Sequence, residues 1–254
     1  MPVRAVLFDL YGTLIHIQTD ENAPHIYWAI SQFLSYHRIV LRPEAVQEQY
    51  QQRVREQKRT SAETWPEMDA QAAWEDILRG GSHHFVEEGR DADGVERVRT
   101  RRRRLARELA RLHRALSRTQ LERYPWAKGL LKQLRGTFRL GVVSDAQRAF
   151  ALPELRVTKI RKYFDAIAIS GDLGYRKPDP RLFHAVCSDL GVSPSEAIFV
   201  GNDMFRDIFG AREAGLRTIW VKTDQGAQNY RDVRAEYDAR DLRQVWEGIQ
   251  FLCR

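Results

Sequence analysis

Short apolar segments that end abruptly in polar residues constrain the fold of this chain more than any other feature. The first covers residues 5–8 (AVLF) and is followed by Asp9, Tyr11, Gly12 and Thr13. A continuous apolar run of this length is typical of a strand buried on both faces of a parallel sheet. Open α/β sheets bind ligands just beyond the carboxyl ends of such strands. Asp9 is therefore a candidate nucleophile or metal ligand, although aspartate at a strand end also serves as a helix cap or turn former.

Three later segments repeat this placement. The polar residues are Ser144 and Asp145 after a strand expected over 139–144, Lys177 in the loop beyond one expected over 164–169, and Asn202, Asp203 and Asp207 after one expected over 197–200. Because the carboxyl ends of parallel strands share one edge of a sheet, we expect these side chains to converge with Asp9.

The remaining pattern predicts an α/β fold with three layers, in which helices cover both faces of a mostly parallel sheet, and an inserted helical domain. A strand is expected over 217–221 and a short edge strand over 236–240. Core helices are expected over 181–190, 208–214 and 241–252, and helices of the insertion over 26–36, 43–59, 70–78 and 95–118. Residues 1–16 and 120–254 would form the discontinuous core, and 17–119 a helical cap without a strand. Trp28, Trp65 and Trp74 are expected in the interior of that cap.

Positive charge is concentrated in one segment. The chain has a net charge of +7, and residues 97–118 carry ten arginines against Glu108, so the rest of the chain is close to neutral. Leu105, Leu109, Leu112 and Leu116 follow a helical spacing in this segment. An amphipathic helix with a solvated arginine face is the simplest interpretation, and a field for anionic substrates is the alternative. Aromatic residues do not alternate with the arginines, so we expect no nucleic-acid partner.

The composition also bears on the cellular location of the protein. Two cysteines, Cys187 and Cys253, make neither a disulfide framework nor a metal cluster. No apolar run reaches the ~18 residues of a membrane span, and no signal-peptide pattern is visible. We expect a cytoplasmic protein without a membrane partner, either a monomer or a homodimer.

The convergent residues suit attack on an electron-poor centre that carries negative charge. Asp9 is the nucleophile in this interpretation, and Lys177 and Ser144 neutralise the anion by charge and hydrogen bonding. Asp9 and Asp203 offer the hard oxygen ligands that Mg²⁺ prefers.

The same segments resemble the haloacid dehalogenase superfamily of hydrolases. The matching motifs are FDLYGTL at 8–14, VVSD at 142–145, KPDP at 177–180 and VGNDMFRDIFGAREAG at 200–215. The resemblance implies a Rossmann-like core with a cap inserted after the first motif. It also implies that Asp9 is the nucleophile, that Ser144 binds the transferred group, and that Lys177 pairs with Asp9.

Departures from the motifs bear on the reaction. The magnesium-dependent phosphatases of this superfamily usually carry a second aspartate two residues after the nucleophile, as a general acid, and here that position is Tyr11. Tyr11 resembles the L-2-haloacid dehalogenase branch, which expels halide and needs no acid. That branch, however, has an asparagine where this chain has Asp145 and a tyrosine where it has Phe183, and it lacks an acid equivalent to Asp203. It also needs a cap arginine, for which Arg38, Arg42, Arg53 and Arg55 are candidates.

We therefore expect a Mg²⁺-dependent hydrolase of a small phosphorylated metabolite, with a cap that excludes water. The predicted catalytic residues are Asp9, Thr13, Ser144 and Lys177; the substrate-binding residues Tyr11, Gly12 and Asp145; the metal ligands Asp9, the Tyr11 carbonyl and Asp203; and the supporting residues Asn202 and Asp207. A metal-free 2-haloacid dehalogenase and a weakly catalytic binding protein are the alternatives.

Overall fold

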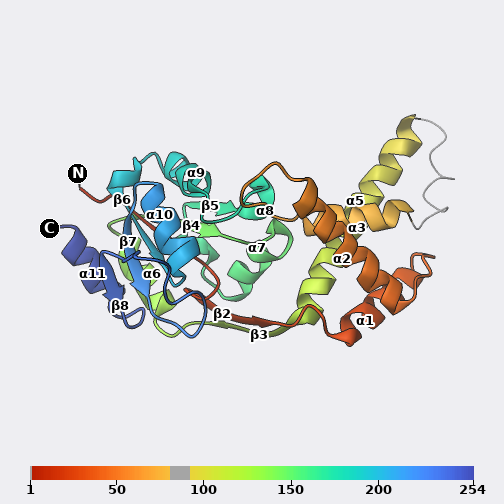
Figure 1. The fold of residues 1–254 in the computed structure, drawn as a ribbon, viewed down its shortest axis with the longest axis horizontal. Helices are drawn as coiled ribbons and strands as arrows, with labels where there is room; N and C mark the ends of the chain where they lie inside the picture. The colour runs from red at the N-terminus through yellow and green to blue at the C-terminus, as the bar shows by residue number, and fades with distance from the viewer. Residues whose placement is uncertain (1, 81–91) are drawn as a thin grey trace. The chain divides into compact units, whose positions relative to one another are not determined.

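The structure, a computed structural model, describes residues 2–80 and 92–254. It divides into two compact units (Figure 1). The sheet unit comprises Met1–Ile17, Glu63–Glu67 and Gln120–Arg254, and the helical unit comprises Gln18–Ala62 and Met68–Thr119. The segment Glu63–Glu67, which lies within the predicted cap range, belongs to the sheet unit.

The sheet unit is built on six parallel strands in the order β5-β4-β1-β6-β7-β8. The strands are β1 (Ala5–Phe8), β4 (Arg139–Ser144), β5 (Ala166–Ile169), β6 (Ala197–Gly201), β7 (Arg217–Val221) and β8 (Tyr237–Ala239). All four residues of β1 are fully buried, as the continuous apolar run predicted. The predicted parallel sheet is confirmed.

Helices cover both faces of this sheet. The helices are α6 (Ala127–Leu134), α7 (Arg148–Val157), α8 (Ser170–Leu173), α9 (Pro180–Leu190), α10 (Gly210–Glu213) and α11 (Val245–Leu252), with short turns at η1 (Arg161–Tyr163) and η2 (Pro194–Glu196) and a π-helical turn at η3 (Met204–Phe209). Alternate residues of β1 point to opposite faces of the sheet. Val6 and Phe8 pack with α6, α7 and α11, while Ala5 and Leu7 pack with α9 and α10. The three-layer architecture therefore holds.

The register of the sheet brings the motif residues to one edge. Phe8 of β1 lies opposite Val142 of β4 and Val200 of β6. Asp9 directly follows Phe8, and both neighbouring strands end within two residues of the same level. Ser144 and Asn202 are consequently close to Asp9 along this edge.

The helical unit consists of four helices within the described residues: α1 (Pro24–Ser35), α2 (Pro43–Thr60), α3 (Ala70–Gly80) and α5 (Ala92–Ser117). On α5, Leu105 and Leu109 are buried, whereas Arg104 is exposed and pairs with Glu108, as expected of an amphipathic helix. Trp74 is fully buried in this unit, but Trp28 is 60% exposed and Trp65 lies in the sheet unit, so the expectation for these two tryptophans was wrong.

A second, two-stranded sheet lies where the chain passes between the units. It pairs β2 (Ile15–Thr19) with β3 (Arg118–Arg123). These strands were not expected in the insertion, because their segments are too polar to be distinguished by an apolar pattern. Within residues 2–80 and 92–254, no helix is both long and apolar enough to cross a membrane.

Candidate active site

A buried lysine lies between two carboxylates at the carboxyl edge of the sheet. Lys177 Nζ lies 2.6 Å from Asp9 Oδ1 and 2.6 Å from Asp207 Oδ1, and the lysine is only 3% exposed. Burial alone would lower the pKa of Lys177, but Asp207, Asp9 and Asp145 together raise it. Lys177 is therefore a fixed cation beside the predicted nucleophile.

Thr13 joins the first motif to the fourth. Its Oγ1 lies 3.0 Å from Asp9 Oδ2 and 2.9 Å from Asn202 Oδ1, so one hydroxyl proton is shared between two acceptors. The Asn202 amide is held from its other side, because Nδ2 donates to the Gln225 carbonyl. Gly12 is required beside it: its φ is +93°, and a Cβ there would lie 2.6 Å from Asn202 Nδ2.

Asp207 organises the loop that follows β6. Its Oδ2 accepts hydrogen bonds from the backbone N–H groups of Asn202 and Asp203, both at 3.0 Å. Gly201 makes room for it, since a Cβ on that residue would lie 2.5 Å from Asp207 Cβ. Burial raises the pKa of Asp207 to about 6, while Lys177 opposes this rise. At neutral pH, Asp207 is thus an ionised partner of Lys177.

Two buried polar atoms of the second motif have no hydrogen-bond partner among the described residues. They are Ser144 Oγ and Asp145 Oδ2. Ser144 is completely buried, and Asp145 uses its other oxygen, Oδ1, to accept the Lys177 N–H at 2.9 Å. Buried polar atoms are normally paired, so these two atoms mark a place prepared for a polar ligand.

Both oxygens of the Asp203 carboxylate accept hydrogen bonds from neighbouring protein groups. Its Oδ1 accepts the N–H groups of Phe205 and Arg206, and its Oδ2 accepts from Nε and one terminal nitrogen of Arg206 and from the Ala227 N–H. Burial alone would raise the pKa of Asp203, but these hydrogen bonds and the Arg206 charge lower it overall. Asp203 thus caps the turn that follows it and pairs with Arg206.

These contacts bear directly on the predicted Mg²⁺ ligands. A carboxylate offers about four lone-pair sites, and Asp203 already accepts five hydrogen bonds. It therefore does not fit a metal-ligand role while Arg206 is bound. In the part of the chain that the structure describes, no group of three or more His, Cys, Asp and Glu side chains is arranged to hold a metal. In the same loop, Asn202 Oδ1 accepts the Thr13 hydroxyl, which also lies within hydrogen-bond distance of Asp9 Oδ2.

Tyr11 contacts a residue that sequence analysis missed. Its hydroxyl donates to Glu154 Oε2 on α7, and its backbone forms an isolated bridge with Ile15. Glu154 is 3% exposed. Nothing in the local sequence around Glu154 indicates this pairing, since it depends on how α7 packs against the first loop.

The segment Glu63–Glu67, which we call the strap, contacts three of the motif loops. Pro66 bridges Tyr175, two residues before Lys177. Glu67 Oε2 accepts from Ser170 Oγ at 2.7 Å, and that Oγ accepts the Ala146 N–H at 2.9 Å. The Trp65 and Phe205 rings meet edge to face with centroids 5.2 Å apart. The strap thus supports the second, third and fourth motifs from within the sheet unit.

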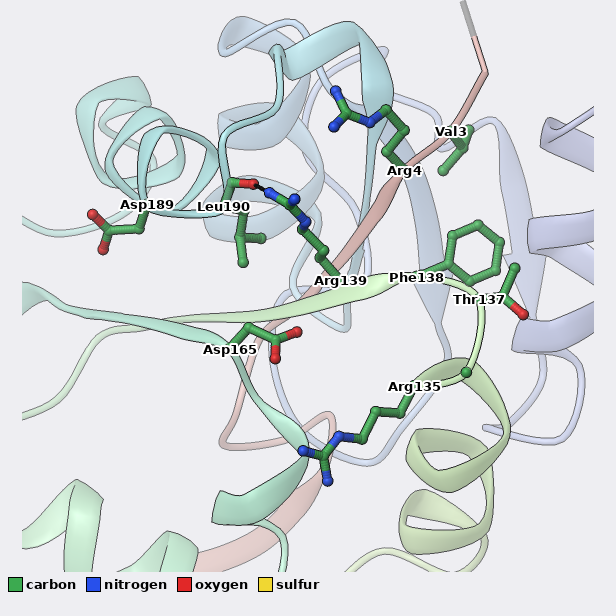
Figure 2. Close-up of a pocket in the computed structure, with 10 residues that line it drawn as sticks. Val3, Arg4, Arg135, Thr137, Phe138, Arg139, Asp165, Asp189 and Leu190 are labelled. Carbon is green, nitrogen blue, oxygen red and sulfur yellow. Dashed lines mark hydrogen bonds between the residues drawn. The ribbon is translucent and has the colours of Figure 1, made fainter.

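A cavity of about 610 Å³ lies at the opposite edge of the sheet, by the amino ends of β1, β4 and β5 (Figure 2). Arg4, Arg135 and Arg139 line it together with Asp165 and Asp189. Figure 2 shows the Arg4 and Arg135 side chains pointing away from one another, while Arg139 donates to the Leu190 carbonyl. None of the predicted site residues lines this cavity.

The sequence of this chain is similar to those of known hydrolases. The haloacid dehalogenase-like hydrolase family matches residues 3–215. A phosphoserine phosphatase from Thermus thermophilus is 35% identical over 184 residues, which cover 71% of this chain and 69% of that protein. The chain belongs to the haloacid dehalogenase-like hydrolase family. This result confirms the resemblance on which the site residues were assigned.

Two further relatives of this chain are named for different reactions. A glyceraldehyde 3-phosphate phosphatase from Pyrococcus furiosus is 29% identical over 52% of this chain and 56% of its own length. The (S)-2-haloacid dehalogenase 4A of Burkholderia cepacia is 26% identical over 50% of this chain and 55% of its length. The chain therefore spans little more than half of these two relatives.

Solved structures of the family share the fold. A 2-haloacid dehalogenase from Pseudomonas syringae pv. Tomato DC3000 aligns over 98% of this chain and 99% of its own with a TM-score of 0.64 and 22% identity. A HAD phosphatase from Thermococcus onnurineus gives a TM-score of 0.57 at 21% identity, covering 97% of this chain and 98% of its own. At these identities the likeness concerns architecture alone.

Proposed function

We propose that this family member hydrolyses a small phosphate monoester through an aspartyl-phosphate on Asp9. The observation that carries the proposal is the Asp9–Lys177–Asp207 arrangement beside the unpartnered Ser144 hydroxyl. A buried carboxylate that is held by a cation and lies next to a free hydrogen-bond donor suits nucleophilic attack on an anionic phosphorus centre.

The chain's own residues supply most of the first step. An oxygen of Asp9 attacks phosphorus, and the bond between phosphorus and the leaving oxygen breaks. The leaving oxygen takes up a proton from solvent water and departs as an alcohol. Lys177 offsets the charge of the phosphoryl oxygens, and Ser144 Oγ donates a hydrogen bond to one of them. Thr13 orients the Asp9 oxygen that Lys177 does not bind.

Water completes the reaction. It attacks phosphorus of the aspartyl-phosphate, the bond to Asp9 breaks, and inorganic phosphate leaves with Asp9 restored. Tyr11 donates its hydroxyl to Glu154, so we assign it no part in this proton transfer and give it a place in the wall of the site.

Mg²⁺ is the cofactor that the family resemblance implies. Asp9, the Tyr11 carbonyl and the Asn202 amide oxygen are the groups that would hold it, in place of Asp203. When bound, the ion supplies additional positive charge to the phosphoryl oxygens. A cytoplasmic location and the choice between a monomer and a homodimer stay predictions from the sequence.

A 2-haloacid dehalogenase is the second candidate, favoured by Tyr11 at the position of the missing acid. Two observations weigh against it. Phe183, at the position of the dehalogenase tyrosine, is completely buried on α9 and packs on Phe199 with ring centroids 4.9 Å apart. Asp145 can supply at most one hydrogen to a carboxylate substrate, whereas the amide of the dehalogenase asparagine supplies two.

The identity of the released product distinguishes the phosphatase from the dehalogenase. Phosphate release is measured with phosphoserine, glyceraldehyde 3-phosphate and further phosphorylated metabolites, in Mg²⁺ and in EDTA, with Asp9→Asn as the blank. Halide release from 2-chloropropionate is measured in parallel. Release of phosphate that is lost in Asp9→Asn supports the phosphatase. Release of halide alone supports the dehalogenase, and no release in either assay supports a binding protein.

A further inference from the structure

The two oxygens of Asp145 have unequal surroundings. Oδ1 accepts the backbone N–H of Lys177 at 2.9 Å. Oδ2 is buried and receives no donor from any residue that the structure describes. An ionised carboxylate spreads its charge over both oxygens, so one bare, buried oxygen is unfavourable for the charged form. A proton on Oδ2 would turn this atom into a hydrogen-bond donor.

The other carboxyls of the site differ from Asp145 because each has donors at both oxygens. Asp9 receives Lys177 on Oδ1 and shares the Thr13 hydroxyl on Oδ2. Asp207 receives Lys177 on Oδ1 and two backbone N–H groups on Oδ2. Asp203 accepts five hydrogen bonds. A proton is therefore accommodated best on Asp145 Oδ2, where it displaces no existing donor.

The charge balance of the site also favours a neutral carboxyl. The charged groups that act on Asp145 are Lys177, Arg206 and Asp207, from the loops after β5 and β6. Burial raises the pKa of Asp145, Lys177 and Arg206 oppose this rise, and Asp207 adds to it. Before Mg²⁺ binds, Lys177 and Arg206 alone would not balance four ionised carboxyls, and the excess negative charge would disfavour an anionic substrate.

We propose that Asp145 is protonated on Oδ2 in the resting enzyme and donates this hydrogen to a phosphoryl oxygen of the substrate, next to the donor Ser144 Oγ. This assignment rests on the proposed phosphatase function. Asp145 then does what an asparagine amide would do at this position, but only while it holds its proton. Substrate binding weakens as the pH rises and Asp145 ionises, since the donor is replaced by a repelling charge.

Asp145→Asn and Asp145→Ala test the proposal, with Asp189→Asn as a matched control. Asparagine keeps a donor at this place without titrating, and alanine removes it. Asp189 is exposed, lines the cavity at the opposite edge of the sheet, and loses the same charge when it is changed. The measurements are the infrared spectrum of protonated carboxyls at neutral pH and the Kd of inorganic phosphate from pH 5 to 8.

We expect a carboxylic-acid band in the wild type and in Asp189→Asn that is absent from Asp145→Asn. Phosphate affinity should fall with rising pH more steeply in the wild type than in Asp145→Asn. Asp145→Ala should bind phosphate about tenfold to a hundredfold more weakly than Asp145→Asn at pH 6, which is the range for one hydrogen bond to a charged group.

The infrared result is independent of the substrate. If Asp145→Asn retains the band, Asp145 is not protonated and the proposal is overturned, even if the protein is a phosphatase. If Asp145→Asn binds phosphate as weakly as Asp145→Ala, the donor role is overturned. If the band is present but the wild type neither binds nor releases phosphate, the phosphatase function fails, and donation to a phosphoryl oxygen fails with it.

Discussion

The Lys177 ammonium and the Asp207 carboxylate form a buried ion pair with Nζ and Oδ1 separated by 2.6 Å, and Asp9 binds the same ammonium at the same distance. Lys177 therefore has a structural role as well as a chemical one. Without it, the Asp9 and Asp207 carboxylates would face each other in the interior with no cation between them.

Lys177→Met should destabilise the fold and abolish turnover. Removing one partner of a buried pair costs about 3–5 kcal/mol, because the remaining charge is left uncompensated. Urea unfolding measures the loss, and Lys132→Met on the exposed side of α6 is the control for loss of a surface lysine. A change within about 1 kcal/mol for Lys177→Met would show that the pair contributes little to stability.

Asp203→Asn and Asn202→Ala should separate fold stability from metal binding. Asp203 caps η3 and pairs with Arg206. Asparagine caps a helix about as well as aspartate but carries no charge. Asp203→Asn should therefore lower the free energy of unfolding by about 1–2 kcal/mol through weaker hydrogen bonds with Arg206, and it should leave Mg²⁺ affinity nearly unchanged. Asn202→Ala should weaken Mg²⁺ binding. Calorimetric titration with MgCl₂ provides the comparison. If Asp203→Asn loses Mg²⁺ while Asn202→Ala keeps it, Asp203 is the ligand, as the sequence predicted.

Ser170→Ala should disturb the second motif through the strap. Ser170 Oγ donates to Glu67 and accepts the Ala146 N–H, which follows Asp145 in the chain. Loss of this hydroxyl should cost about 1–3 kcal/mol of stability, since the buried N–H loses its partner. It should also raise KM more than it lowers kcat, because Asp145 shifts. Ser188→Ala, on the exposed side of α9, should change neither. An unchanged KM in Ser170→Ala would show that the strap does not influence substrate binding.

The helical unit should lose stability in mild acid because of His113. Burial lowers the pKa of this imidazole to about 4, and Arg114 adds to the effect. The unfolded chain takes up the proton near pH 6.5, so the stabilising contribution is complete above that pH and is lost as the pH falls toward 4. At about 1.4 kcal/mol for each pKa unit, the loss approaches 3 kcal/mol.

His113→Phe keeps the ring contacts with Tyr50 and Trp74 and removes the titration. Unfolding free energies measured from pH 7 to 4 should therefore fall less steeply in His113→Phe than in the wild type. Equal slopes would mean that His113 is protonated at its ordinary pKa in the folded protein.

Features that depend on local pattern were predictable from the sequence. The strand that ends at Asp9, the strand that ends at Ser144 and the loop at Lys177 follow from apolar runs and motif order, and parallel strands bring their carboxyl ends together. The chain's membership of the family confirms the resemblance, and the expected α/β sheet is present.

Features that depend on tertiary packing were not predictable. Glu154 accepts the Tyr11 hydroxyl, and Ala227 donates its backbone N–H to Asp203. Neither partner is marked by periodicity or motif spacing. The strap was missed for the same reason, because its contacts with Tyr175, Ser170 and Phe205 are what separate it from the surrounding helical segments. β2 and β3 were missed because two mostly polar, partly exposed strands lack an apolar signal.

The central claim is that Asp9 carries the phosphoryl group. The most direct test is a single turnover with an accepted phosphomonoester, quenched in acid, followed by mass spectrometry of the peptide that contains Asp9. Our account predicts one added phosphoryl group on that peptide in the wild type. It predicts none in Asp9→Asn, together with a loss of turnover of at least about a thousandfold and an unchanged circular dichroism spectrum. A phosphatase that turns over without modification of this peptide, or an Asp9→Asn variant with full activity, would contradict the account.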